Sequence, residues 1–356
     1  MGGLASYFIR RFLLMIPTFL GITVIFFFIL QIVPGGPLEL EIMKLRSGAA
    51  SLGGAGGGGA EVSGSSAGSM GTVEIPAEAM EQMKKFYGMD KPIIARYGHW
   101  LWNTMHLDLG ISYVYQEPVW DVIKSRFPIS IYFGILGLII SYSVCVPLGI
   151  AKAIHHSTKF DLVSSILVFI GYSTPGWALG MVLLVYFGGG SFWSVFPLGD
   201  FRSENFDQLT LIGKIIDQGK HTILPIIAYV IGGFATLTII MKNGLLENLG
   251  QDYVRTAFAK GLPEKRVIFV HALRNSLIPI ATSIGHIISA VLFAGSFLIE
   301  RTFNINGIGM LGYTSLIQRD YPVSLGFLVI GGMLGLMGNI LSDIVYALVD
   351  PRIRFK

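Results

Sequence analysis

The sequence carries little charge for its length. Only 13% of its 356 residues are Asp, Glu, Lys or Arg, whereas soluble domains usually contain about 25% charged residues. Hydrophobic residues make up 52%, and the mean hydropathy is +0.64. So little polar surface cannot cover a water-soluble particle of this size, and two soluble domains would leave the long apolar runs unexplained. The composition therefore indicates a membrane protein.

Cysteine is nearly absent, since Cys145 is the single one, and it lies inside an apolar run. A disulfide within the chain is excluded, and we expect a buried free thiol. Basic residues exceed acidic ones, and the pI is about 9.0. The basic residues occur in short clusters between apolar segments, which is typical of membrane proteins and argues against a nucleic-acid partner.

Catalytic motifs are missing as well. Gly213-Lys214 and Gly219-Lys220 lack the following hydroxyl residue and the upstream glycine of a phosphate-binding loop. His155-His156 has no third metal ligand nearby, and the hydrolase-like pattern at residues 64–68 stands in low-complexity chain without the strand and helix it requires. We therefore expect no catalytic, cofactor-binding or metal site and no enzyme. An intramembrane hydrolase would need a catalytic dyad, which the sequence lacks.

Six apolar runs have roughly the 20 residues that a membrane-spanning helix needs. They are residues 12–33, 129–153, 162–187, 223–246, 277–299 and 324–349. The first run is too long for a signal peptide and has no cleavage site, so we expect it to remain as a span. Gly176/Gly180 and Gly331/Gly335 have the spacing that lets helices approach closely. The expected fold is an all-α membrane protein with six transmembrane helices.

The basic residues also predict orientation. With six spans, both termini share one side with the loops after the second and fourth spans, and that side holds 13 of the 26 Lys and Arg against five acidic residues. The opposite side has the other 13 with 16 acidic residues. The positive-inside rule then places both termini in the cytoplasm. Residues 1–33 form the N-terminus and first span, 34–128 an external region, 129–349 a five-helix core, and 350–356 a cytoplasmic tail.

The external region contains a Gly-, Ser- and Ala-rich stretch at residues 47–71 with one charge, Glu61. Such a stretch buries too little apolar surface to offset its ordering entropy, so we expect a flexible loop. Residues 77–87 and 93–105 follow as predicted amphipathic helices. The second carries Tyr97, Trp100 and Trp102, which suit an interfacial position.

Ionisable residues within spans are few. His286 is a candidate for the translocation path, and a neutral histidine bonded to a neighbouring helix is the alternative. We expect Asp343 to pair with a cation near the cytoplasmic side, and Glu300 and Arg301 to be solvated at the external mouth. A proton-coupled secondary transporter, the alternative function, usually has more intramembrane carboxylates than this.

The loop at residues 247–276 is too polar to enter the membrane. Residues 252–260 predict a helix, Gly261 permits a left-handed turn, and Pro263 begins a second helix that ends near residue 273. Val267, Val270 and Ala272-Leu273 offer apolar contacts, and the small residues Ala257, Ala259 and Gly261 would let a partner approach closely. A basic helical hairpin of this kind indicates a docking element. An amphipathic hairpin on the lipid surface is the alternative.

The sequence of this loop resembles a conserved segment of a known protein family. Residues 252–261 (D-Y-V-R-T-A-F-A-K-G) and 271–279 (H-A-L-R-N-S-L-I-P) are similar to the EAA loop of binding-protein-dependent ABC permeases, in the dipeptide/oligopeptide branch. Arg255 and Thr256 replace the glutamate and the first alanine of the general motif, as is usual in that branch. The resemblance continues in residues 34–37, 96–97, 108–112, 118–119, 319–322 and 350–354. The long Gly-rich insertion resembles the B-type permease of microcin C/oligopeptide importers.

The resemblance implies a type I ABC importer permease fold in the bacterial inner membrane. It implies a passive subunit that pairs with a second, homologous permease and two ABC ATPase subunits, receives peptides from an extracytoplasmic binding protein, and works by alternating access. ATP and Mg would bind only to the ATPases. The residues expected to form the ATPase-docking loop are Asp252, Tyr253, Arg255, Thr256, Ala257, Ala259, Lys260, Gly261, Leu262, His271 and Arg274.

Overall fold

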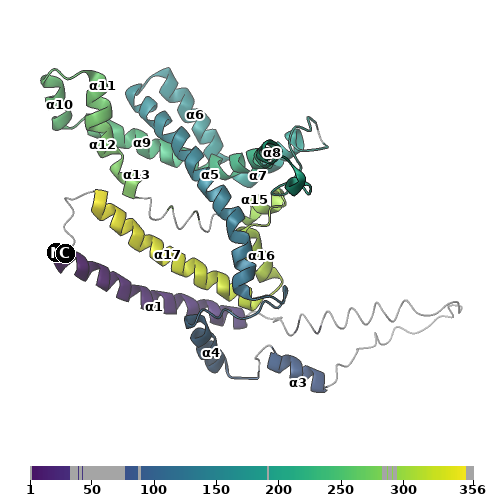
Figure 1. The fold of residues 1–356 in the computed structure, drawn as a ribbon. Coiled ribbons are helices and arrows are strands. Elements are labelled where there is room, and N and C mark those ends of the chain that lie inside the picture. Colours follow the sequence, from purple (N-terminus) through teal and green to yellow (C-terminus); the bar gives the residue numbers. More distant parts are fainter. Residues whose placement is uncertain are drawn as a thin grey trace, which may run out of the picture. The chain divides into compact units, whose positions relative to one another are not determined.

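The computed structural model describes residues 2–32, 39, 42, 77–86, 90–190, 192–282, 287, 291 and 295–349. The regular elements among them are helices, as expected (Figure 1). The Gly-rich stretch 47–71, the 34–37 turn, His286 and the 350–356 tail lie outside the described residues. The chain divides into two compact units, residues 1–19, 123–314 and 329–356, and residues 20–122 and 315–328.

Among the described residues, four helices are long and apolar enough to cross a membrane. They are parts of α1 (Gly2–Ile32), α5 (Val119–Ile154), the α8–α9 pair (Leu211–Val230 and Phe234–Leu249) and α17 (Tyr321–Val349). Each matches one expected span. Large hydrophobic side chains cover their exposed surfaces, as lipid contact requires. Ten of the 23 residues of the expected span at 277–299 lie outside the described residues, so the count of six spans stays a prediction.

The expected third span is broken in two. α6 (Lys159–Ser173) and α7 (Gly176–Phe187) meet at an angle of 94°. Pro175 disfavours the helical conformation of the residue before it, and Thr174 accordingly has an extended backbone with ψ 119°. A single straight helix over residues 162–187 was therefore wrong, and the segment is a bent helix pair.

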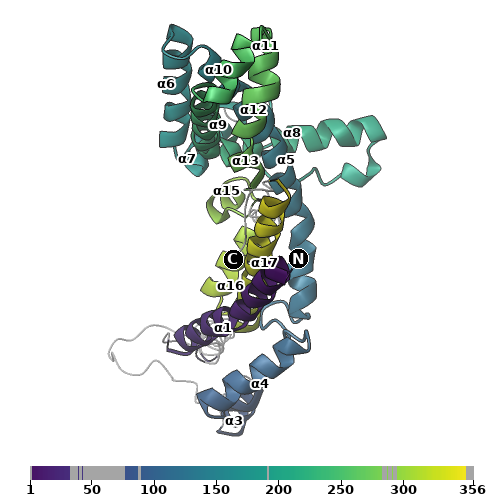
Figure 2. The same cartoon turned by 90° about the vertical axis from the view of Figure 1, so that its left-hand side faces the viewer.

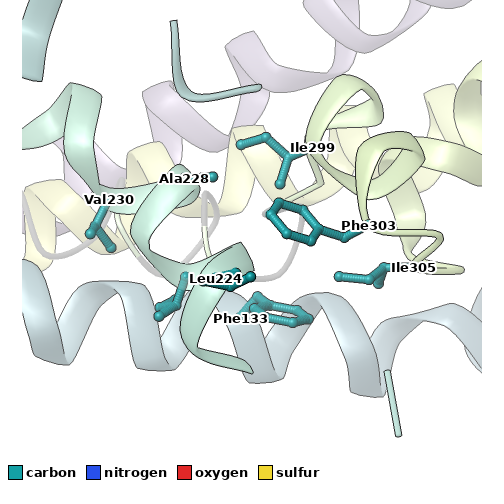
Figure 3. Close-up of a cluster of buried hydrophobic side chains, with 8 residues drawn as sticks. Phe133, Leu224, Ala228, Val230, Ile299, Phe303 and Ile305 are labelled. Carbon is teal, nitrogen blue, oxygen red and sulfur yellow. The ribbon is translucent and has the colours of Figure 1, made fainter. Parts of the chain in front are cut away.

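The first unit has an apolar core between α5, α7, α8 and α15 (Phe297–Thr302). Figure 3 shows Phe303 close to Ile299, with Phe133 on a facing helix. Gly180 leaves room for this ring, because a Cβ at that position would lie 2.9 Å from Phe303. A Cβ at Gly176 would clash with the Ala228 carbonyl oxygen of α8, so the expected close packing at Gly176/Gly180 is confirmed, whereas a Cβ at Gly335 would meet no described atom within 4 Å. Cys145 is a buried free thiol, as expected.

Glu300 is not solvated as expected, since its side chain is only 1% exposed. Its carboxylate accepts hydrogen bonds from the backbone N–H groups of Gly309 (3.3 Å) and Met310 (2.5 Å), at the start of α16 (Ile308–Ile317), and from the Tyr229 hydroxyl (3.4 Å). Burial raises the pKa of Glu300 to about 7. Arg301, by contrast, is exposed as expected.

Asp343 pairs with a cation, which confirms the predicted pairing, and the cytoplasmic side of the pair stays a prediction. Its carboxylate forms an ion pair with Arg11 of α1 and accepts a hydrogen bond from Tyr7 at 3.3 Å. The Arg11 guanidinium also donates to the Tyr7 oxygen at 2.6 Å. These contacts join the N-terminal half of α1 to the C-terminal half of α17.

The second unit is built on the C-terminal half of α1, with α3 (Ala77–Phe86) and α4 (Ile93–Met105) as the sequence predicted. Tyr97 and Trp100 pack against Phe27 in its core, while Trp102 remains exposed, and its interfacial position stays a prediction. The buried Asp320 accepts hydrogen bonds from Ser112 Oγ (2.5 Å) and from the N–H groups of Tyr113 and Val114. Two segments that carry the family resemblance, 108–112 and 319–322, are thereby bonded to each other.

Candidate docking site

The polar segment after α9 folds as a helical hairpin (Figure 2). Its first arm is α10 (Asp252–Ala259), and its second arm runs through α11 (Glu264–Arg266), the π-helical turn η3 (Val267–Ala272) and α12 (Leu273–Ser276). The two helices and the break between them were predicted correctly. The second arm continues three residues beyond the expected end.

The turn between the arms depends on Gly261. Its φ of +76° is in the left-handed region, which favours glycine. Gly261 N–H donates to Phe258 O at 2.9 Å, and Leu262 N–H donates to Ala257 O at 3.4 Å. These are the two hydrogen bonds of a Schellman motif. A Cβ at Gly261 would meet no described atom within 4 Å, so backbone conformation rather than space requires glycine here.

The inner face of the hairpin is packed against α9 and α5. It consists of Val254, Ala257, Val267 and Ala272, which form a core with Met241 and Leu245 of α9 and Ala153 of α5. Ala257 is only 7% exposed. Its expected place on a partner-contact face was therefore wrong. Because Val254 and Ala257 are three residues apart, they share one helix face, and that face is directed inward.

The outer face is aromatic and basic. Its exposed apolar residues are Tyr253, Phe258, Phe269 and Val270. Its exposed basic residues are Arg255, Lys260, Lys265, Arg266 and Arg274. Phe258 and Phe269 were not predicted from the sequence to be surface residues of the hairpin. Phe258 follows directly after Ala257, so once Ala257 faces inward, Phe258 has to point elsewhere. Aromatic and arginine side chains together are typical of the residues that dominate protein interfaces.

The other expected docking residues differ in their surroundings. Ala259 is exposed and His271 is partly buried, whereas Leu262 packs against the core under the inner face. Asp252 and Arg255 form an exposed ion pair at 3.4 Å, which contributes little to stability. Thr256 Oγ1 donates back to Asp252 O at 2.9 Å, so its hydroxyl is used within α10.

The hairpin is also fastened to α9 directly. Ser276 Oγ shares its proton between Ala272 O (2.8 Å) and Gly244 O (3.1 Å), and a Cβ at Gly244 would lie 3.4 Å from the Ser276 carbonyl oxygen. The two helices thus approach at a residue without a side chain. The end of the hairpin and α9 are held together by both packing and a hydrogen bond.

A buried charge cluster lies beside this core. Lys152 of α5 is 2% exposed, and its Nζ contacts Asp161 Oδ1 (3.2 Å), Ser164 Oγ (2.9 Å) and Ser165 Oγ (2.6 Å). Lys242 of α9 donates to both Asp161 carboxylate oxygens at 2.7 Å. Both lysines are paired side chains that join α5, α6 and α9.

Residues 145–355 match the family described as "Binding-protein-dependent transport system inner membrane component". This range covers more than half of the chain and includes the entire hairpin. The chain belongs to this family. The permease is thus a subunit of a transport system, and the alternative of a proton-coupled secondary transporter is set aside.

Relatives match over nearly the whole length of the permease. It is 41% identical over 99% of its chain to the inner membrane ABC transporter permease protein YejB of Escherichia coli O157:H7, whose whole length is covered. It is 40% identical to the peptidoglycan transport system permease protein YejB of Agrobacterium fabrum and 33% identical to the dipeptide transport system permease protein DppB of Escherichia coli strain K12, with 99% of each chain covered in both cases.

Proposed function

We propose that this permease is the membrane-embedded subunit of an ATP-driven importer of peptides in the bacterial inner membrane. The family membership and the peptide-transport names of relatives such as DppB support this proposal. A second homologous permease, two ABC ATPase subunits and an extracytoplasmic peptide-binding protein complete the importer. ATP and Mg bind to the ATPases, and this chain contributes no catalytic group.

The proposed mechanism depends on the two faces of the hairpin. The outer face docks on an ATPase subunit, and the inner face is packed on α9 and α5. Because packed interiors are close to incompressible, a displacement of the hairpin moves these helices instead of being absorbed by a loop. ATP-driven closure of the ATPases thereby shifts the spans between inward-open and outward-open states, which is alternating access.

Docking is tested by Phe269→Ser and Phe258→Ser, with Phe192→Ser as the matched control. Phe258, Phe269 and Phe192 are 46%, 51% and 71% exposed, so no replacement opens a core. Loss of an interface hot spot costs about 2 kcal/mol or more, roughly a thirtyfold weaker association. We expect the two hairpin variants to accumulate normally in the membrane, to retain less ATPase during purification, and to lose peptide-stimulated ATP hydrolysis. Wild-type ATPase retention in both would contradict docking by this face.

The substrate we propose is an oligopeptide or a modified peptide of the microcin C type. The test reconstitutes the complete importer in liposomes and compares the uptake of a labelled tripeptide, a microcin C analogue and a peptidoglycan-derived peptide, since one relative is named for peptidoglycan transport. ATP-dependent uptake of at least one peptide is expected. Uptake by this chain alone under a proton gradient would instead support a secondary transporter.

Cytoplasmic location of both termini is proposed from the charge bias of 13 basic against five acidic residues on that side. Reporter fusions after Lys356 and at Ser157, in the exposed turn between α5 and α6, should report cytoplasm. A fusion at Gly57 should report the opposite side. A cytoplasmic signal at Gly57 would refute this topology.

A further inference from the structure

A cavity lies between the N-terminal half of α1 and the C-terminal half of α17. Its volume is about 650 Å³, within the range of roughly 300–1,000 Å³ usual for small-molecule sites. Ten residues line it: Ser6, Tyr7, Arg10, Arg11, Leu14, Met15 and Thr18 of α1, and Leu336, Asn339 and Ile340 of α17. None of them belongs to the docking hairpin.

The lining changes from polar to apolar along α1. Ser6, Tyr7, Arg10 and Arg11 occupy the end near the N-terminus, and Leu14 and Met15 follow. Thr18 Oγ1 donates to Leu14 O at 2.8 Å, so its hydroxyl is used within the helix. The cavity therefore has a basic, polar end and an apolar end.

The charges at the polar end do not cancel. Arg11 is neutralised by its ion pair with Asp343. Arg10 is exposed, and no ion pair or hydrogen bond joins its side chain to any residue in the described part of the chain. A guanidinium presents up to five donors in a planar fork that matches the oxygens of a phosphate group. One cation at the mouth of the cavity is thus free to bind an anion.

The length of the cavity matches one membrane leaflet. Twelve steps separate Ser6 from Thr18, which at about 1.5 Å per residue is roughly 18 Å. Half of a hydrocarbon core of about 30 Å is about 15 Å. The basic end therefore falls at headgroup level when the apolar end lies among acyl chains.

The rim of the cavity is open to the bilayer. Phe12, Leu13 and Ile16 of α1 are 51–60% exposed, and Met337 of α17 is also exposed. These side chains continue the apolar surface on which lipid tails lie. A soluble anion would match only the basic end, whereas a peptide would leave its backbone groups unsatisfied against the apolar wall. An amphipathic anion matches both ends.

We propose that this cavity is a binding site for an anionic phospholipid, with the phosphate group on Arg10 and an acyl chain along Leu14, Met15, Leu336 and Ile340. Basic pockets between transmembrane helices are known to bind anionic headgroups. The bound lipid fills the space between α1 and α17, the helices joined by the Arg11–Asp343 pair. It thereby favours one packing of α1 against the rest of its unit.

Native mass spectrometry of the full-length permease, extracted with its partner subunits in mild detergent, tests the proposal. The probes are phosphatidylglycerol, phosphatidylcholine and inorganic phosphate. We expect the wild type to retain phosphatidylglycerol over phosphatidylcholine, and Arg10→Gln to bind it about tenfold more weakly, as expected for the loss of one charge-assisted contact. Lys159→Gln, an exposed lysine outside the cavity, is the matched control and should behave as wild type. Ile340→Trp, which fills the apolar end, should also lower phosphatidylglycerol binding.

Three results would overturn the site. Equal retention of phosphatidylglycerol by Arg10→Gln and the wild type would show that Arg10 does not bind the phosphate group. Displacement of the lipid by inorganic phosphate would indicate a site for a free anion. Crosslinks from Leu336 to another subunit in the intact importer, with lipid content unchanged in both variants, would show that a protein covers the cavity.

Discussion

Replacing Asp161 by asparagine removes the carboxylate that both Lys152 and Lys242 contact. Lys242 donates to both carboxylate oxygens at 2.7 Å, and it loses the negative charge and one of these two acceptors, because the asparagine amide keeps one oxygen. Lys152 keeps the Asp161 backbone oxygen (3.0 Å) and the hydroxyls of Ser164 and Ser165. The variant therefore leaves two cations without a carboxylate at the junction of α5, α6 and α9. Lys242 keeps fewer oxygen contacts than Lys152.

The expected loss of stability follows from this geometry. Removing one partner of a buried ion pair costs about 3–5 kcal/mol, because the other charge remains desolvated. Lys152 retains three oxygen contacts, and Lys242 is 15% exposed and can reach some water. We therefore expect about 3 kcal/mol, at the lower end of that range. At about 2 °C per kcal/mol, the melting temperature should fall by about 6 °C.

Thermal unfolding of the detergent-purified permease at fixed scan rate measures this shift. Asp207→Asn is the control, since Asp207 is an exposed aspartate in no described ion pair. Adding Lys242→Met to Asp161→Asn removes the orphaned cation and should recover about 1 kcal/mol or more. Asp161→Asn with a melting temperature within about 1 °C of the wild type would refute the view that this cluster holds the three helices together.

Three further predictions test the turn, the buried carboxylate and the glycine-rich region. Gly261→Val forces a β-branched residue into a φ of +76° and should cost about 1–3 kcal/mol, whereas Gly261→Asn should be milder because asparagine tolerates this conformation; equal melting temperatures would contradict the argument. The raised pKa of Glu300 means that the folded state binds its proton more tightly, so the free energy of unfolding should fall as the pH rises from 4.5 to about 7. Glu300→Gln should flatten this part of the stability profile. An unchanged slope in the variant would show that Glu300 is not its cause. Deletion of residues 49–69 should leave membrane accumulation unchanged on an immunoblot, because loop-closure entropy depends weakly on length; loss of accumulation would show that the segment is needed for folding.

Local sequence signals were sufficient for the helical elements. Apolar runs located the described spans, and the Gly261–Pro263 break located the turn of the docking hairpin, because both features depend on residues close together in the chain. Pro175 could have predicted the break between α6 and α7, since its effect on Thr174 is local too. The family resemblance of residues 252–261 and 271–279 was visible for the same reason.

The partners of individual side chains were not predictable in this way. Asp161 and Lys242 are 81 residues apart, and Ser112 and Asp320 are 208 apart, so no local periodicity relates them. A lysine next to a loop is usually solvated, so the local sequence around Lys152 favours a surface cation. Only the packing of α6 against α5 and α9 supplies the oxygens that make its burial tolerable.

The sequence by itself determined that the chain is helical, that it lies in a membrane, and that a glycine-dependent hairpin follows α9. The tertiary structure decided which face of that hairpin is available to a partner. Ala257 and Phe258 are neighbours in an eight-residue helix with apolar residues on both sides, so periodicity alone cannot select the inward face. The surface offered by α9 and α5 accommodates the small Ala257, and Phe258 is left exposed on the outer face.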